Sequence, residues 1–589
     1  MNLRDVIHEV CGEFESGSSG ANPILYEEAF TRRAKQASEA GDGRLAPRLR
    51  LLAGVFSMCF GFGAGGPFVP LGSLPDGRRT FLPEDLTAED AAEIEDLIGV
   101  SDEPVFVARL ADLLWITTRR HPYAQRAVHG YLKSVDRETE SWLLQWNYLK
   151  RAAQVGMELG SKAAEREEVR VKIEILFERD RHQCFTPGLG AWPAALAEIL
   201  IEHRLVSNWQ KLGDECIAIG GGFPIQPGCD EPRRYYALAA TCYERAGRSA
   251  DAQEAKLAIA KHWEAEAAQF RTPDGEAGFQ IAHRLEGAID AYRKAGGQRA
   301  EVARLMAELR RANKVALSQM KGIGVPVDVE PLVLEARRVM TGKIGLAAVE
   351  AFAGLRAPTS YVTARANAVT QSKEHPLLAT MPSKIMVSEG NVAATVPSML
   401  EDEAAKLQTM IIQMYNMNQD LLGATILEEA RSILASGEAE AWPAAVHELV
   451  ETSTFVPDDR RAIYARALVA GFEGDRVLFQ HLIIPQLENS VRQVFCEAGL
   501  QVTSIDAQGV QEERNLNQLL RLEGAKNVLG EDLVWEMRSL LVEKTGPNLR
   551  NRVCHGLAAD GDYERPAGNA LLWLTVFLLL RYRCSQPTE

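Results

Sequence analysis

The residues best suited to chemistry lie near the C-terminal end of the sequence. Arg550 and Asn551 are followed by His555 in the segment Asn548-Leu549-Arg550-Asn551-Arg552-Val553-Cys554-His555-Gly556. A histidine exchanges a proton near neutral pH, and the planar charged fork of an arginine suits a phosphate group. Asn551 and His555 stand at i,i+4, so both project from one face if the segment is helical. The spacing therefore predicts proton transfer beside a bound phosphate.

RNA cleavage by the 2′-hydroxyl requires groups of this kind. One group takes the hydroxyl proton, one protonates the leaving 5′ oxygen, and positive charge lies near the phosphate, without any need for a metal. Asn551 could fix the imidazole tautomer or bind the ribose-phosphate, and Arg552 is either a further phosphate contact or a solvated arginine. Cys554 lacks a second base and is a poor nucleophile. A structural alternative stays open, in which Arg550 and His555 only brace a helix turn.

A long amphipathic helix predicted over residues 476–498 must position this segment. On it, Glu488 and Arg492 stand at i,i+4, the spacing of an ion pair on one helix face. We interpret them as structural support for the motif, with a position facing the cleft as the alternative. Further helices are predicted over residues 515–522 and 532–544.

The motif has the RNxxxH form and resembles the HEPN superfamily of α-helical ribonucleases and nucleotide-binding domains. Arg476 and His481 have the same bare spacing, but only the later copy follows Gly546-Pro547 and has Gly after His. Residues 481–492 together with residues 548–556 resemble, more narrowly, a DUF4209-type C-terminal domain. Residues 111–115 and the hairpin after residues 375–377 resemble other portions of proteins that carry that domain.

This resemblance implies a metal-independent endoribonuclease that acts on RNA, with Arg550, Asn551 and His555 as catalytic residues and Arg552 binding substrate. It also implies a homodimer in which two motifs face each other across a composite site. By analogy, the chain would be a regulated toxin-like or anti-phage effector, whose helical region binds a protein partner or trigger. The alternative is a non-catalytic helical scaffold whose HEPN-like domain dimerises or binds a nucleotide.

The last apolar segment leaves two interpretations open. Its side chains could contribute to pairing of two chains or could pack inside one protomer, and they are Leu571, Leu572, Trp573, Val576, Phe577 and Leu580. From residue 547 to 583 the sequence has five arginines against three acidic residues, a net charge of +2. Any attraction for RNA is therefore expected to be local.

The composition of the whole chain limits the function classes. Its 589 residues allow about four domains, and 46% hydrophobic residues are enough for sizeable cores. Lys+Arg 65 against Asp+Glu 80 gives a net charge of -15, which excludes broad phosphate binding. The nine cysteines show no CxxC pair, and no signal peptide or membrane-length apolar run is found. We expect a cytoplasmic protein with no membrane partner.

Other motifs of enzymes and cofactor sites fail in their context. Residues 61–66 match GxGxxG, but Pro67 and Pro70 leave no helix N-terminus for a pyrophosphate. No P-loop and no HExxH zinc motif occurs, and neither a cofactor nor a metal is predicted. Arg109, Asp112 and His121 favour a network between helices over a catalytic set.

The sequence predicts a mainly α fold in five parts. Residues 1–100 form an N-terminal region with a Gly/Pro-rich loop, and residues 101–230 form a helical domain. Residues 231–320 hold helical hairpins similar to TPR units, because Tyr243 to Gly247 is echoed by Tyr292 to Gly296. Residues 321–470 are helical with one small β-hairpin, at residues 384–387 and 391–396. Residues 471–589 form the HEPN-like bundle.

Overall fold

The protein is described here by a computed structural model. It describes residues 2–15, 22–63, 66–74, 76–138, 141–186, 189–273, 275–321, 326–387, 390–436, 441–505 and 509–583. The chain divides into two compact units, Met1–Ala316 (unit 1) and Leu317–Glu589 (unit 2). Helices dominate both, and every sheet of the described residues has two strands, which confirms the mainly α prediction. The finer division into five parts stays a prediction.

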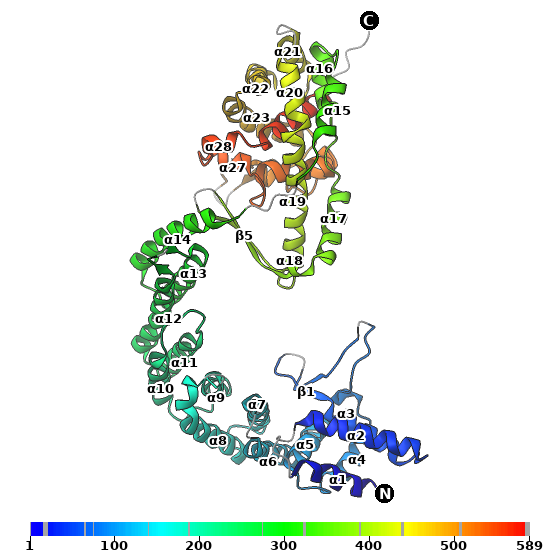
Figure 1. Cartoon of the computed structure of the whole chain (residues 1–589), viewed down its shortest axis with the longest axis vertical. Coiled ribbons are helices and arrows are strands. Elements are labelled where there is room, and N and C mark those ends of the chain that lie inside the picture. The colour runs from blue at the N-terminus through cyan, green and yellow to red at the C-terminus, as the bar shows by residue number, and fades with distance from the viewer. Residues whose placement is uncertain are drawn as a thin grey trace. The chain divides into compact units, whose positions relative to one another are not determined.

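Unit 1 begins with a group of helices (Figure 1). Aromatic residues such as Tyr26, Phe30 and Phe56 are buried between them. A capping box starts α4, because the Thr87 side chain accepts from the Asp90 N–H and the Asp90 side chain accepts from the Thr87 N–H. A 3₁₀ turn at Pro83–Asp85 precedes it. The elements of this part are α1 (Leu3–Glu15), α2 (Pro23–Glu39), α3 (Leu45–Phe56), β1 (Met58–Phe60), β2 (Phe68–Pro70), α4 (Ala88–Leu97), α5 (Pro104–Thr118), α6 (His121–Arg137) and α7 (Trp142–Glu158).

The rest of unit 1 is a series of antiparallel helices. It contains α8 (Ala164–Asp180), a 3₁₀ turn at Arg181–Phe185, α9 (Ala191–Glu202), α10 (Trp209–Gly222), α11 (Glu231–Arg245), α12 (Ser249–Gln269), β3 (Arg271–Thr272), β4 (Gly275–Glu276), α13 (Gly278–Ala295) and α14 (Arg299–Gln319). Gly247 and Gly296 follow α11 and α13 with φ of 74° and 77°, the left-handed region that glycine reaches at little cost. The predicted helical hairpins are therefore confirmed.

In the first part of unit 2, the long helix α19 runs beside α17 (Figure 1). Its elements are α15 (Glu330–Met340), α16 (Gly345–Gly354), α17 (Tyr361–Glu374), α18 (Pro376–Thr380), β5 (Ser383–Met386), β6 (Val392–Val396), α19 (Glu403–Ala424), α20 (Ile426–Ser436), α21 (Ala441–Thr452), a 3₁₀ turn (Asp458–Arg460) and α22 (Arg461–Glu473). The antiparallel pair of β5 and β6 confirms the predicted β-hairpin. Glu389, in its turn, lies outside the described residues.

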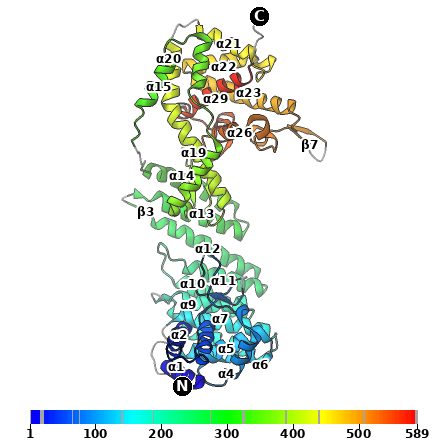
Figure 2. The same ribbon diagram turned by 90° about the vertical axis from the view of Figure 1, so that its right-hand side faces the viewer.

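The remainder of unit 2 carries the motif. It consists of α23 (Arg476–Glu497), β7 (Thr503–Ile505), β8 (Gln511–Glu513), α24 (Leu516–Leu519), α25 (Ala525–Leu529), α26 (Glu531–Met537), a π-helix (Arg538–Val542), α27 (Leu549–Cys554), α28 (Asp560–Tyr563) and α29 (Ala567–Arg581). The β7–β8 hairpin extends away from the helices of this unit (Figure 2). Helix α29 runs through the core, with Leu571, Trp573 and Val576 fully buried.

Two predictions about strands and helix lengths need correction. The sequence predicts one β-hairpin, whereas the described residues form four two-stranded sheets. The other three were missed because their strands have only two or three residues each, too few to show a hydrophobic alternation. The helix predicted over residues 515–522 is only the single turn α24, and that over residues 532–544 is completed by the π-helix. Residues 61–66 lie between β1 and β2 with Ala64 and Gly65 outside the described residues, and β2, a strand, follows them.

Candidate catalytic site

The motif lies on the short helix α27, which the core of unit 2 anchors. Leu549 and Val553 are buried, so the helix presents its polar residues on its other faces. Asn548 precedes it in the left-handed conformation, with φ 51° and ψ 42°. His555 ends it, and its backbone N–H donates to the Asn551 carbonyl oxygen at 3.2 Å. Asn551 and His555 thus occupy successive turns of one helix face.

A chain of hydrogen bonds links α27 to α23. Arg550 Nε donates to Glu488 Oε2 at 3.0 Å, and Arg492 donates to Glu488 Oε1 at 3.2 Å. Arg550 Nη1 donates to Asn551 Oδ1 at 3.1 Å, and Asn551 Nδ2 donates to Asn548 Oδ1 at 2.7 Å. The pair of Glu488 and Arg492 has the geometry that its spacing predicts. Glu488 in addition holds the guanidinium of the motif arginine.

His555 differs from Arg550 and Asn551 in that its side chain is exposed and makes no polar contact with the described residues. The Asn551 amide, for which we considered a contact to the imidazole or to ribose-phosphate, is bonded to Arg550 and Asn548 instead. The structure therefore gathers Arg550, Asn551 and Glu488 into one network and leaves His555 free beside it.

Arg552 lies on a different face of α27 from Arg550, because residues two positions apart on a helix do not face each other. Its guanidinium forms an ion pair with Asp562 of α28, which Arg565 also contacts at 3.1 Å. Burial alone would raise the pKa of Asp562, but the Ala559 N–H and the two arginines outweigh it and lower that pKa. Arg552 is consequently a partner of Asp562 and is not a solvated arginine.

Cys554 and the second R-x4-H match, Arg476 and His481, were two other candidates near the motif. Burial raises the pKa of the Cys554 thiol, which lowers its thiolate fraction and supports the view that Cys554 is no nucleophile. In the second R-x4-H match, Arg476 pairs with Glu428 and Glu564, and His481 bonds the Tyr563 hydroxyl at 2.8 Å. That match serves helix packing.

Sequence reasoning missed two backbone features that come just before the motif. The π-helix Arg538–Val542 and the left-handed Asn548 are both conformations that are enriched at functional sites. The only available signal was Asn548 itself, since asparagine tolerates positive φ better than most residues. Neither feature can be recognised from hydrophobic periodicity.

Unit 1 holds a fully buried polar cluster on α5, α6 and α7. Asp112 Oδ2 accepts from Tyr131 Oη at 2.7 Å and from Arg151 Nε at 2.8 Å, and Asp112 Oδ1 accepts from Arg151 Nη2 at 2.7 Å. Arg109 lies 4.8 and 4.6 Å from the ring centres of Phe60 and Phe68. These contacts support the predicted network between helices, in which His121 is not included.

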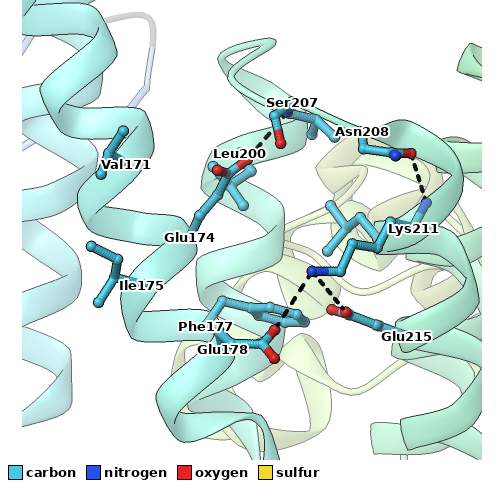
Figure 3. Close-up of a pocket in the computed structure, with 12 residues that line it drawn as sticks. Val171, Glu174, Ile175, Phe177, Glu178, Leu200, Ser207, Asn208, Lys211 and Glu215 are labelled. Carbon is cyan, nitrogen blue, oxygen red and sulfur yellow. Dashed lines mark hydrogen bonds and ion pairs between the residues drawn. The ribbon is translucent and has the colours of Figure 1, made fainter.

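A groove of about 260 Å³ lies among α8, α9 and α10 in the same unit (Figure 3). Lys211 Nζ is 3.6 Å from Glu215 and 4.0 Å from Glu178, and Asn208 caps the helix by accepting from the Lys211 N–H at 2.9 Å. Glu174 is paired with Arg170. The charged groups of this groove are therefore paired with one another or with Arg170, and the groove offers no feature that marks it as a catalytic site.

Neither a metal cluster nor a membrane helix is found in the described residues. No three histidine, cysteine or acidic side chains of that part of the chain are grouped to hold a metal ion. None of its helices is both long and apolar enough to cross a lipid bilayer.

Comparisons with known proteins bear mainly on unit 1. Residues 1–168 match a family described as a domain of unknown function, DUF7380. No curated protein matches the chain. A solved structure described as a circular tandem repeat protein with novel repeat topology and enhanced subunit contact surfaces aligns with 98% of this chain and 96% of its own, at 14% identity and a TM-score of 0.12. The family match includes the Asp112 cluster and ends far before the motif of α27, so the function of unit 2 has to be argued from its own residues.

Proposed function

We propose that the protein is a metal-independent endoribonuclease of HEPN type that cleaves RNA through the 2′-hydroxyl. One observation carries this proposal: Arg550, Asn551 and His555 lie together on α27, with the guanidinium fixed by Glu488 and the imidazole exposed. A fixed charge and a mobile proton carrier are the two parts that phosphodiester transesterification needs.

In the proposed reaction the 2′ oxygen attacks the adjacent phosphorus, and the bond from phosphorus to the 5′ oxygen breaks. His555 takes the proton of the 2′-hydroxyl, while a second acid gives a proton to the 5′ oxygen. The products are a 2′,3′-cyclic phosphate and a free 5′-hydroxyl. Arg550 would offset the charge that grows on the phosphate, through Nη2, for which no hydrogen bond is present among the described residues.

A single histidine cannot hold and give a proton at the same moment, so we propose a homodimer in which a second His555 is the acid. An isologous pair would place two Arg550 and two His555 around one phosphate. The side chains of α29 that could have paired, such as Leu572 and Trp573, are buried within the protomer. We therefore assign the pairing surface to the exposed side of α27.

The wider biological role is argued by analogy. We propose a cytoplasmic effector of toxin-like or anti-phage type, in which the helices of unit 1 bind a protein partner or trigger that controls unit 2. The scattered cysteines, without paired spacing, support a reducing compartment.

The test is incubation of the full chain with total RNA in EDTA. We expect the wild type to leave 2′,3′-cyclic phosphate ends, and His555→Ala and Arg550→Ala each to slow cleavage about 10²–10⁴-fold. His481→Ala is the matched control, because it removes the histidine of the other R-x4-H match in the same unit. Equal cleavage by all four proteins would assign the activity to a contaminant and overturn the proposal.

One observation favours a second function. Because Glu488 already neutralises Arg550, the motif could act as a brace in a non-catalytic scaffold that dimerises or binds a nucleotide. In that case the wild type would be as inactive as both motif variants, while Arg550→Ala would lower the thermal stability of unit 2. A wild type that cleaves RNA would rule out the scaffold.

A further inference from the structure

A polar cavity of about 220 Å³ lies beside α27, on the face that carries Arg552. Helices α19, α23, α27 and α28 and the turn before α29 all contribute to its wall. Its polar residues are Asn416, Asp420, Gln480, Arg552, Asp562 and Arg565. The cavity is smaller than the roughly 300–1,000 Å³ pockets that enclose drug-sized ligands, so it suits a small group such as one nucleobase with its fused rings.

The cavity contains buried hydrogen-bonding groups that the protein leaves unused. Gln480 is 1% exposed, and its Nε2 has no hydrogen-bond partner in the described residues. Asn416 Nδ2 donates to the Thr545 carbonyl oxygen at 3.2 Å, whereas its buried Oδ1 has no partner there. Leaving such groups unsatisfied is costly, which indicates a ligand or bound water in this space.

The charges of the cavity argue against an anionic ligand. Arg552 and Arg565 both contact Asp562, so their charge is partly neutralised. Asp420 is exposed and has no ion pair or hydrogen bond within the described residues. Desolvation raises the pKa of Asp420, which the nearby Arg565 opposes only in part. The carboxylate of Asp420 and the amide donor of Gln480 line the same cavity, and neither has a partner among the described residues. Such a pair favours a ligand with two hydrogen-bond donors and one acceptor.

Among nucleobases, guanine has this pattern on its Watson–Crick edge. Its N1–H and N2–H donors lie side by side, next to the O6 acceptor. Adenine places a donor beside an acceptor, and cytosine and uracil each have one donor site on this edge. Pro547 and Leu549 also line the cavity, and their apolar side chains could pack on the faces of a ring, as apolar side chains do in base-reading sites.

We propose that this cavity binds the guanine base of a nucleotide, with Asp420 accepting from N1–H and N2–H and the Gln480 amide donating to O6. Guanine can come from an RNA strand or from a free nucleotide. Its assignment to the RNA rests on the proposed nuclease function, and it would make the base next to the cleaved phosphate guanine, since α27 carries both Arg550 and Arg552.

Calorimetric titration of the full chain with nucleotides tests the assignment. We expect GMP to bind at least about tenfold more tightly than AMP, CMP or UMP, because an unsatisfied buried partner in each mismatch costs about that factor. Inosine monophosphate lacks the N2 amine and is expected to bind about tenfold more weakly than GMP. Equal binding of all these nucleotides, or none, would overturn the proposal.

Substitutions in the cavity give an independent test of guanine binding. Asp420→Asn keeps the shape of an exposed residue and is expected to weaken GMP binding about tenfold, as is Gln480→Met. Asp560→Asn, an acidic residue of the same unit outside the cavity, is the matched control and should bind GMP as the wild type does. Unchanged GMP affinity in both cavity variants would refute the assignment even if Gln480→Met were less stable.

A non-cleavable single-stranded RNA with one guanine separates the two sources. If it competes with GMP, the base belongs to the RNA, and sequencing of cleavage ends should find guanine beside the cut. If GMP binds and the RNA does not compete, the ligand is a free nucleotide. GMP binding without any RNA cleavage would refute only the nuclease, whereas cleavage without guanine preference and without GMP binding would refute only the cavity.

Discussion

Two clusters of arginine and carboxylate side chains, one in each unit, show opposite uses of the same chemistry. In unit 1, Asp112 is 0% exposed, and Arg151 meets both of its carboxylate oxygens. In unit 2, Glu488 and Arg550 are 16% and 20% exposed, and Glu488 shares one oxygen with each of two arginines. The first cluster is closed, and the second borders solvent.

This difference separates a structural polar cluster from a candidate site better than residue types do. Burial raises the pKa of Tyr131 well above its ordinary value, an effect that the Asp112 charge reinforces, so this hydroxyl stays protonated. The Tyr131 hydroxyl therefore serves as a hydrogen-bond donor to Asp112 and is not a proton source. The unit 2 cluster lies beside His555, an exposed imidazole that solvent can reach.

The largest expected effect tests the closed cluster. Asp112→Ala leaves Arg151 buried without its partner and should lower the free energy of unfolding of unit 1 by about 3–5 kcal/mol. Urea denaturation followed by tryptophan fluorescence measures the change. Asp290→Ala is the control, because Asp290 and Lys294 form an exposed pair in the same unit and its loss should cost less than about 1 kcal/mol. Similar losses in both variants would erase the contrast between the clusters.

The next effect concerns the open cluster and should appear in activity. Glu488→Ala frees the Arg550 guanidinium, and a misplaced phosphate contact is expected to slow RNA cleavage by about 10²-fold. The measurement is the cleavage rate at saturating RNA, together with thermal unfolding. Glu497→Ala on the same helix, which loses only a bond from Gln493, should leave the rate unchanged. A Glu488→Ala protein that is unstable but fully active would make Glu488 a structural residue only.

The sequence predicted local features of the site and not the contacts that close it. The pair of Glu488 and Arg492 follows from i,i+4 spacing, and α23 ends within one residue of its prediction. Glu488 and Arg550 are 62 residues apart, so their bond depends on the packing of two helices that no pattern in either segment encodes. Likewise, only the packing of α19 against its neighbours brings Asn416 and Gln480 to one cavity. Long-range pairing of polar groups is set by tertiary structure, which one sequence does not display.

Short irregular elements were missed for a different reason. The strand β8 has the sequence Gln-Glu-Glu and is wholly exposed, so backbone hydrogen bonds to β7 form it without any hydrophobic alternation. The predicted β5–β6 hairpin was found because its strands contain Ile385, Val392 and Val396 around a Gly. Apolar β-branched residues make a strand visible in a sequence, and polar strands lack that signal.

A third prediction uses pH to sharpen the contrast on the other face of α27. Asp562→Asn should cost about 1–2 kcal/mol at pH 7, since the wild-type carboxylate accepts charge-assisted bonds from Arg552 and Arg565. The folded pKa of Asp562 lies below the ordinary value of 3.8. The wild-type advantage should therefore be complete above about pH 5 and decline as the pH falls below 3.8.

Chemical denaturation of the two proteins at a series of pH values measures this advantage. The exposed Asp560→Asn variant should show no such dependence. An advantage of Asp562 that grows toward acid would have the wrong sign and would contradict the ion pairs.

The smallest expected effect concerns the backbone that starts α27. Asn548 has a φ of 51°, and its side chain accepts a bond from Asn551 at 2.7 Å. Asn548→Ala loses that bond and keeps the strain, whereas Asn548→Gly loses the bond and relieves the strain, so the glycine variant should be the more stable by about 1 kcal/mol. Arg119 has a φ of 56° at the end of α5 and offers the same Ala and Gly comparison in unit 1. The Arg119 side chain is 62% exposed, so solvent weakens both its ion pair with Glu158 and its contact with the Trp115 ring, whose centre is 5.2 Å away. Gly should there exceed the wild type, while at Asn548 it should not. If Asn548→Gly gained as much stability as Arg119→Gly, the hydrogen bond between Asn548 and Asn551 would contribute nothing to stability. Asn548 would then not be part of the network around Arg550.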